Sequence, residues 1–139
     1  MQVLHDSPKL YVIFLYKGEK LRASLRQFAI ENHVTSAWLN AVGTLKKPKL
    51  NFYRRKKRKF ESKVFKGRWD LAEFHGSISE KHGKPRVHIH ASIKRGERES
   101  KLAHLCEARV IAPVEIHVHL IDDPKTARKK EAIKTMCPI

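Results

Sequence analysis

Two hydrophobic patterns occupy the first third of the chain. Residues 10–16 form an unbroken apolar and aromatic run that Lys17 and Gly18 close. Short runs of this composition favour a β-strand, and an unbroken one predicts a strand that is buried on both faces. From residue 19 to about residue 32, apolar side chains recur at helical spacing, with Leu21, Leu25 and Phe28 on one side. This segment is predicted to be one amphipathic helix packed on a sheet.

Beyond the helix, the pattern changes to short apolar segments that are predicted to be strands joined by hairpins. These segments are residues 37–45, 50–53, 60–65, 71–78, 87–93 and 108–121. One helix followed by a run of strands predicts an α+β fold with a largely antiparallel sheet, because parallel crossovers need more helices than the sequence provides.

The length of 139 residues is typical of one domain with one hydrophobic core. We assign residues 1–9 to an N-terminal extension, residues 10–121 to the domain, and residues 122–139 to a basic C-terminal tail. The tail is compatible with a short helix, which Asp122-Asp123-Pro124 would begin, and equally with a disordered segment.

The net charge of the chain predicts a polyanionic partner, which the hydrophobic pattern alone does not. Thirty Lys and Arg against fourteen Asp and Glu give a formal net charge of +16. Solubility requires a net charge of only about 2 to 8 in a small domain. The excess therefore predicts a partner such as nucleic acid.

The excess charge is concentrated between Thr44 and Arg68, where twelve Lys or Arg stand against Glu61 alone. Six consecutive cations repel one another, so they should occupy a solvated hairpin tip and gain most when phosphates replace their counterions. Phe52, Tyr53 and Phe60 flank the run, and we expect them to anchor strands rather than to stack on bases. The predicted nucleic-acid-binding residues are Arg54, Arg55, Lys56, Lys57, Arg58, Lys59, Lys46, Lys47 and Lys49.

Two pairs of histidines alternate with apolar residues at strand spacing, so each pair projects both rings from one face. His88 and His90 form one pair, and His117 and His119 form the other. His104 is the nearest candidate for a third ligand beside the first pair. Three imidazoles with an open fourth position are typical of a zinc site of the catalytic type. Spacing alone does not rank the two pairs.

The order of motifs resembles the plant and prokaryote conserved (PPC) domain. The resemblance covers residues 10–121, and it rests most on Gly83-Lys84-Pro85-Arg86-Val87-His88-Ile89-His90-Ala91, followed by His104-Leu105 and Glu107-Ala108-Arg109-Val110. It implies a homotrimer of α/β sandwiches and a metal-type site, for which zinc is the expected ion. Carried across by position, the ligands are His88, His90 and His104.

Three positions depart from the family pattern. Leu102-Ala103 replaces a pair of glycines before His104, Ala108 replaces the glycine after Glu107, and the cations of residues 54–59 replace a polar or mildly acidic segment. The third change is the one expected to alter function. Plant members combine the domain with AT-hooks, whose Arg-Gly-Arg-Pro core is absent here.

The leading hypothesis is a non-enzymatic protein that binds nucleic acid, DNA in the first place, through phosphate contacts without a base code. One alternative is a zinc enzyme that uses the three histidines, with Glu73, Glu107 or Glu115 as its base. Another is a module that binds acidic proteins or membrane surfaces.

Location is predicted from what the sequence lacks. No signal peptide or transmembrane segment is evident, and the two cysteines suggest no disulfide framework. We therefore expect an intracellular protein, nucleoid-associated, or nuclear if the source is eukaryotic.

Overall fold

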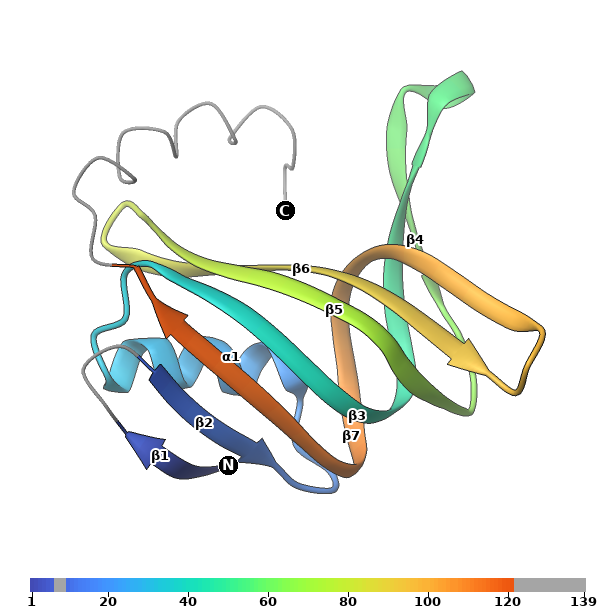
Figure 1. The fold of residues 1–139 in the computed structure, drawn as a ribbon. Helices are drawn as coiled ribbons and strands as arrows, with labels where there is room; N and C mark the ends of the chain where they lie inside the picture. The colour runs from blue at the N-terminus through green and yellow to red at the C-terminus, as the bar shows by residue number, and fades with distance from the viewer. Residues whose placement is uncertain (7–9, 122–139) are drawn as a thin grey trace.

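The structure is a computed structural model that describes residues 1–6 and 10–121, and it consists of a strongly bent antiparallel sheet with one helix (Figure 1). In chain order the elements are β1 (Gln2–Asp6), β2 (Leu10–Leu15), α1 (Leu21–Glu31), β3 (Ala37–Arg54), the 3-10 turn η1 (Arg55–Lys57), β4 (Lys59–Val64), β5 (Arg68–Lys81), β6 (Lys84–Arg95) and β7 (Glu99–Leu120). The predicted α+β class, with one principal helix in one compact domain, is confirmed.

The sheet folds back on itself because two long strands pair twice. The strand order is β1-β2-β7-β6-β5-β3-β4, with an additional pairing of β7 with β3. The C-terminal half of β7 lies between β2 and β3, and its N-terminal half pairs with β6. The strands β3, β5, β6 and β7 therefore close a ring, one opening of which is covered by α1 (Figure 1).

Gly43 lies where β3 bends across β7. Its φ is +148°, a backbone conformation that few L residues adopt. A Cβ at this position would stand 2.7 Å from Val114 Cγ2 and 2.8 Å from Val114 Cα. The pairing of β3 with β7 shifts register on both sides of Thr44, so this close approach belongs to the bend that closes the ring.

The core lies between α1 and the concave side of the sheet. Leu21, Leu25, Phe28 and Ala29 are buried, which confirms the predicted helix face. On β6, Val87, Ile89, Ala91 and Ile93 are buried, so the other side chains of that strand face outward. Every second residue of β6 thus contributes to the core, as the alternation predicts.

Three details of the predicted elements are wrong. Strand β2 is fully buried on one face only: Ile13 and Leu15 are buried, while Val12 and Phe14 remain partly exposed. The helix packs on the buried face, where Phe28 contacts Tyr11. Strand β3 runs unbroken through the polar segment 46–49, which it accommodates by one register shift within that segment and one directly after it. Strand β7 begins at Glu99 rather than near residue 108, because the long polar stretch pairs with β6.

The two ends of the chain differ in what the structure describes. Gln2–Asp6, which we assigned to an N-terminal extension, pairs with β2 as an edge strand. The predicted tail, 122–139, lies outside the described residues. Across residues 1–6 and 10–121, no helix is both long enough and apolar enough to cross a bilayer.

Candidate nucleic-acid interface and histidine cluster

The six consecutive cations occupy the tip of the β3–β4 hairpin, which projects from the body of the domain (Figure 1). Arg54 pairs with Lys59, and the four residues between them form the turn. All six side chains are exposed. Arg58 adopts φ +49°, and its backbone N–H donates a hydrogen bond to the carbonyl of Arg55 at 3.2 Å. The hairpin-tip placement of this run is confirmed.

Little of this charge is neutralised within the domain. Glu61 accepts hydrogen bonds from Lys57 Nζ at 2.7 Å and from Arg54 Nε at 3.2 Å. The hydrogen bond from Lys57 is the main cause that lowers the pKa of the partly exposed Glu61 carboxyl. In the part of the chain that the structure describes, the other four tip cations form no salt bridge.

The three remaining predicted contact residues lie at the other end of the hairpin. Lys46, Lys47 and Lys49 are exposed, but Lys49 is five residues from Arg54 along β3, or about 16 Å at 3.3 Å per residue. The structure thus places all nine predicted residues on one hairpin and its base, in two groups. Only the group at the tip places six positive charges on consecutive residues.

Aromatic side chains fix the hairpin to the domain. Phe52 contacts Phe65 edge to face at 6.1 Å between ring centroids, and Phe65 contacts the buried Trp69 at 5.8 Å. Tyr53 packs against Phe60 at 5.2 Å but remains 53% exposed. Phe52 and Phe60 therefore anchor strands, as expected, while half of the Tyr53 surface stays in solvent beside the cations.

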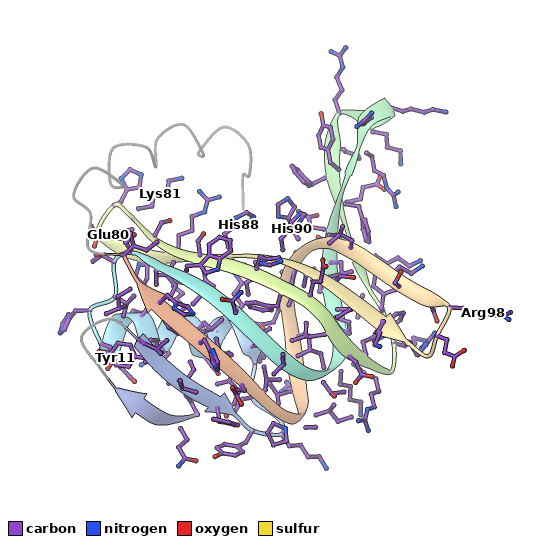
Figure 2. The ribbon with its side chains drawn as sticks, viewed as in Figure 1. Tyr11, Glu80, Lys81, His88, His90 and Arg98 are labelled. Carbon is purple, nitrogen blue, oxygen red and sulfur yellow. The ribbon has the colours of Figure 1, made fainter. Side chains whose placement is uncertain are left out.

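Three histidine rings gather on the outer face of the sheet, where β6 meets β7. His90 lies directly opposite His104 in the antiparallel pairing, and their ring centroids are 4.7 Å apart. The rings of His88 and His104 are 4.9 Å apart. Figure 2 shows His88 and His90 on the same side of β6. His104 itself lies within a regular strand rather than after a long loop, since only residues 96–98 separate β6 from β7.

Burial keeps two of these rings neutral. It lowers the pKa of His88 to about 4, with the neighbouring His104 and His90 as the next causes. Burial also lowers the pKa of His104, and His90 adds to the effect. A neutral imidazole is the form that binds a metal ion, so the chemistry of this donor set fits zinc.

The ring nitrogens of His88 and His104 lie closer together than two nitrogen ligands of one metal ion. His88 Nε2 and His104 Nδ1 are 2.8 Å apart and share a hydrogen bond, in which one nitrogen donates and the other accepts. Two nitrogens on one tetrahedral zinc ion would stand roughly 3.3 Å apart, given Zn–N bonds near 2.05 Å. No set of three His, Cys, Asp or Glu within residues 1–6 and 10–121 has the arrangement needed to hold a metal ion.

The other histidine pair lies elsewhere on the sheet. The ring centroids of His117 and His119 are 6.4 Å apart, and His117 Nε2 contacts Glu115 Oε1 at 2.6 Å. Asn40 and His75 lie between His117 and His90 in the cross-strand register. The two pairs are therefore separate clusters.

Glu107, one of the acids considered as a catalytic base, caps the helix instead. Its Oε1 accepts the backbone N–H of Arg22 at 2.8 Å, and its Oε2 accepts that of Ala23 at 3.2 Å. A carboxylate at this place satisfies free helical N–H groups and complements the positive end of the helix dipole. Glu115 contacts His117, and Glu73 is exposed.

Two residues that sequence reasoning missed complete the histidine face. His75 on β5 lies opposite His90 and also contacts the ring of Trp38 at 5.9 Å. Trp38 is 44% exposed. The candidate ligand patterns of the sequence include neither residue, and only the pairing of β5 with β6 and β3 brings them beside the cluster.

Arg22 is the third missed residue. Strands β6 and β7 pair from Arg95 and Glu99 up to His90 and His104 and then separate. Beyond this fork, Arg22 Nε donates to the carbonyl of Val87 on β6 at 3.1 Å, and Nη1 donates to the carbonyl of Cys106 on β7 at 3.4 Å. A side chain from α1 thus replaces strand-to-strand hydrogen bonds next to the histidines.

A family model places this geometry among known proteins. Residues 5–122 match the Plants and Prokaryotes Conserved (PCC) domain. The chain belongs to this family. This is the plant and prokaryote conserved domain, abbreviated PCC or PPC. The match includes the helix, the basic hairpin and the histidine cluster.

Solved structures of similar fold agree with this assignment. A PPC protein from Pyrococcus horikoshii is 28% identical, with a TM-score of 0.75 over 83% of this chain and 80% of that chain. A "putative DNA-binding protein" from Ralstonia eutropha JMP134 is 26% identical, with a TM-score of 0.76 over 87% and 89%. A metal-containing protein from Archaeoglobus fulgidus is 22% identical, with a TM-score of 0.76 over 86% and 84%. A comparison with curated proteins finds no match.

Proposed function

We propose that this PPC-domain protein binds nucleic acid, DNA in the first place, without catalysing a reaction. The observation that carries the proposal is the projecting hairpin tip with six exposed cations and Glu61 as their neighbouring acid. Lys and Arg at such a tip neutralise phosphates, and this releases counterions from the nucleic acid. The name of the Ralstonia eutropha relative supports DNA as the partner.

Assembly would strengthen this binding. The resemblance to the family implies a trimer, which would present three copies of the hairpin. Linked sites raise avidity by 10² to 10⁴ without new contacts when geometry allows simultaneous engagement. We therefore expect a trimer that binds DNA without reading its sequence, inside the cell and at the nucleoid or in a nucleus.

The direct test measures the affinity of the full chain for a fluorescent DNA duplex at several salt concentrations. If four tip cations each neutralise one phosphate, the slope of log K against log salt is about −3.6 or steeper, at about −0.9 per contact. A slope between zero and about −1 contradicts the proposal. Tighter binding to phosphatidylserine vesicles than to the duplex, at equal phosphate concentration, would instead favour a membrane-surface module.

The histidine cluster supports a second role, zinc binding by His88, His90 and His104. The ring of His104 lies between the other two, 4.9 Å from His88 and 4.7 Å from His90 between centroids. Burial lowers the pKa of His88 and of His104, which favours the neutral form of these two rings. A bound zinc ion would supply Lewis acidity and a water of lowered pKa. Because Glu107 and Glu115 are engaged by the helix and by His117, we expect a structural or regulatory ion rather than a hydrolytic one.

Zinc titration of the purified full chain tests this role. We expect about one zinc per chain, because three imidazoles meet the usual ligand number of an open zinc site. A His88→Ala/His90→Ala variant should lose the ion, while a His117→Ala/His119→Ala variant should keep it. Retention by the first variant, or loss by the second alone, would assign the metal to other residues.

A further inference from the structure

A cleft of about 520 Å³ lies between α1, along most of its length, and the start of β6. It is open to solvent, and the end of β5, where Figure 2 labels Lys81, forms part of its wall together with the first residues of β6. The charged residues that line it are Arg22, Arg26, Lys81, Lys84, Arg86 and Glu107. Five of these six side chains carry a positive charge.

The one carboxylate in the cleft does little to offset these cations. Both Glu107 oxygens accept backbone N–H groups of the first turn of α1, and Oε1 also accepts the N–H of Ala108 at 3.0 Å. The Glu107 charge is therefore directed at the helix terminus. An anion that enters the cleft would meet a surplus of positive charge in a concave space, where the field is stronger than on a flat surface.

Arg22 is held in place at the inner end of the cleft. Its guanidinium is half-buried and fixed by the carbonyls of Val87 and Cys106, as described above. These two bonds use two of the five N–H groups of the side chain. Pre-organisation of this kind lowers the entropy cost of binding an anion.

The cleft leads to the histidine cluster. Arg22 and Arg86 line both the cleft and a small adjoining pocket, and His88 and His104 line the same pocket. A ligand bound to Arg22 would thus lie next to the hydrogen-bonded imidazole pair. The β3–β4 hairpin borders this pocket, because the ring of Phe60 on β4 lies 5.8 Å from that of His104 between centroids. The hairpin tip itself projects away from the end of β5 that Lys81 marks (Figure 2).

We propose that this cleft binds a small phosphorylated molecule, a phosphate monoester with a modest organic group. Its volume is within the range of about 300 to 1,000 Å³ that is typical of small-molecule sites. A dianionic phosphate matches several converging cations better than a single carboxylate, and arginine forks bind its oxygens in pairs. Ile30, Pro85 and Val87 provide apolar surface for the organic group.

The test uses adenosine 5′-monophosphate as the probe, with adenosine as the ligand that lacks only the phosphate. Calorimetric titration of the full chain should detect binding of the monophosphate, with competition by inorganic phosphate, and no binding of adenosine. An Arg26→Gln/Lys84→Gln variant should bind the monophosphate at least about tenfold more weakly, because each lost charge-assisted hydrogen bond contributes about that factor. Both replaced side chains are exposed, so the fold should be unaffected.

A Lys94→Gln/Arg98→Gln variant is the matched control, because it loses the same charge at exposed positions outside the cleft. Its affinity for the monophosphate should stay within about twofold of the original, since long-range effects of exposed charges are screened by salt. Equal weakening by both variants would overturn the proposal. A competition experiment gives a second check, with the variant whose hairpin-tip cations are neutralised. If a DNA duplex displaces the monophosphate from this variant, the cleft binds a phosphate of the nucleic acid, and the proposal is overturned.

Discussion

Neutralising the four hairpin-tip cations that form no salt bridge with the described residues is expected to weaken duplex DNA binding by between three and four orders of magnitude, or about 4,000-fold, at 0.1 M salt. Four phosphate contacts contribute about −3.6 to the slope of log K against log salt. The contribution of counterion release to the binding constant vanishes at about 1 M salt. Along this slope it raises the binding constant by about three and a half orders of magnitude at 0.1 M salt. The loss should shrink steadily as salt is raised.

The variant is designed to keep the hairpin intact. Arg55, Lys56 and Lys59 become Gln, and Arg58 becomes Gly because its φ of +49° suits glycine. Arg54, Lys57 and Glu61 remain, so the two salt bridges of the hairpin are preserved. Duplex binding is then measured by fluorescence anisotropy at several salt concentrations.

The control removes four exposed cations elsewhere, with Lys17, Lys20, Lys94 and Arg98 replaced by Gln. Both variants have the same net charge, so a general attraction between the domain and DNA would weaken equally in the two. The proposal requires that only the hairpin variant lose the steep salt dependence. If the control loses as much affinity, the hairpin is not the contact surface.

Replacing Gly43 with Ala is expected to destabilise the domain by roughly 2 to 6 kcal/mol. Backbone strain in a conformation that belongs to glycine costs about 1 to 3 kcal/mol. Overpacking adds about 1 to 3 kcal/mol, and here the added Cβ would meet the Val114 backbone, which cannot rotate away. At about 3 to 4 °C per kcal/mol for a chain of this size, the melting temperature should fall by at least about 6 °C.

Gly18 supplies the matched comparison. Its φ is +94°, but a Cβ there would have no atom within 4 Å. Gly18→Ala therefore carries the strain without the overlap, and we expect it to cost only about 1 to 3 kcal/mol. Thermal unfolding of both variants separates the two causes. Equal losses of stability would show that the close approach of β3 to β7 contributes nothing.

The sequence by itself determined the elements whose causes are local. Helical spacing of Leu21, Leu25 and Phe28 located α1, because burial of one helix face needs that period. Alternation around His88 and His90 predicted which side chains of β6 face outward, because successive residues of a strand point to opposite faces. Six adjacent cations predicted an exposed hairpin tip, because like charges require solvent.

Only the tertiary structure decided which distant residues meet. Nothing local places His104 opposite His90, or His75 on the other side of it, since strand register depends on pairing between segments far apart in the chain. For the same reason the sequence did not rank the pair His88 and His90 against His117 and His119. Pairing also kept β3 and β7 continuous through polar stretches that suggested breaks, because hydrogen bonds to a neighbouring strand hold a segment whose own residues favour a turn.

The cleft and its arginine depend on tertiary structure entirely. In the sequence, nothing distinguishes Arg22 from the other cations of the helix, or Glu107 from the other acids of the strands. The separation of β6 from β7 beyond the histidines exposes backbone carbonyls that Arg22 then satisfies, while Glu107 satisfies the free N–H groups of α1. Buried backbone groups require partners, and a folded chain supplies them from wherever its packing brings a donor or acceptor within reach.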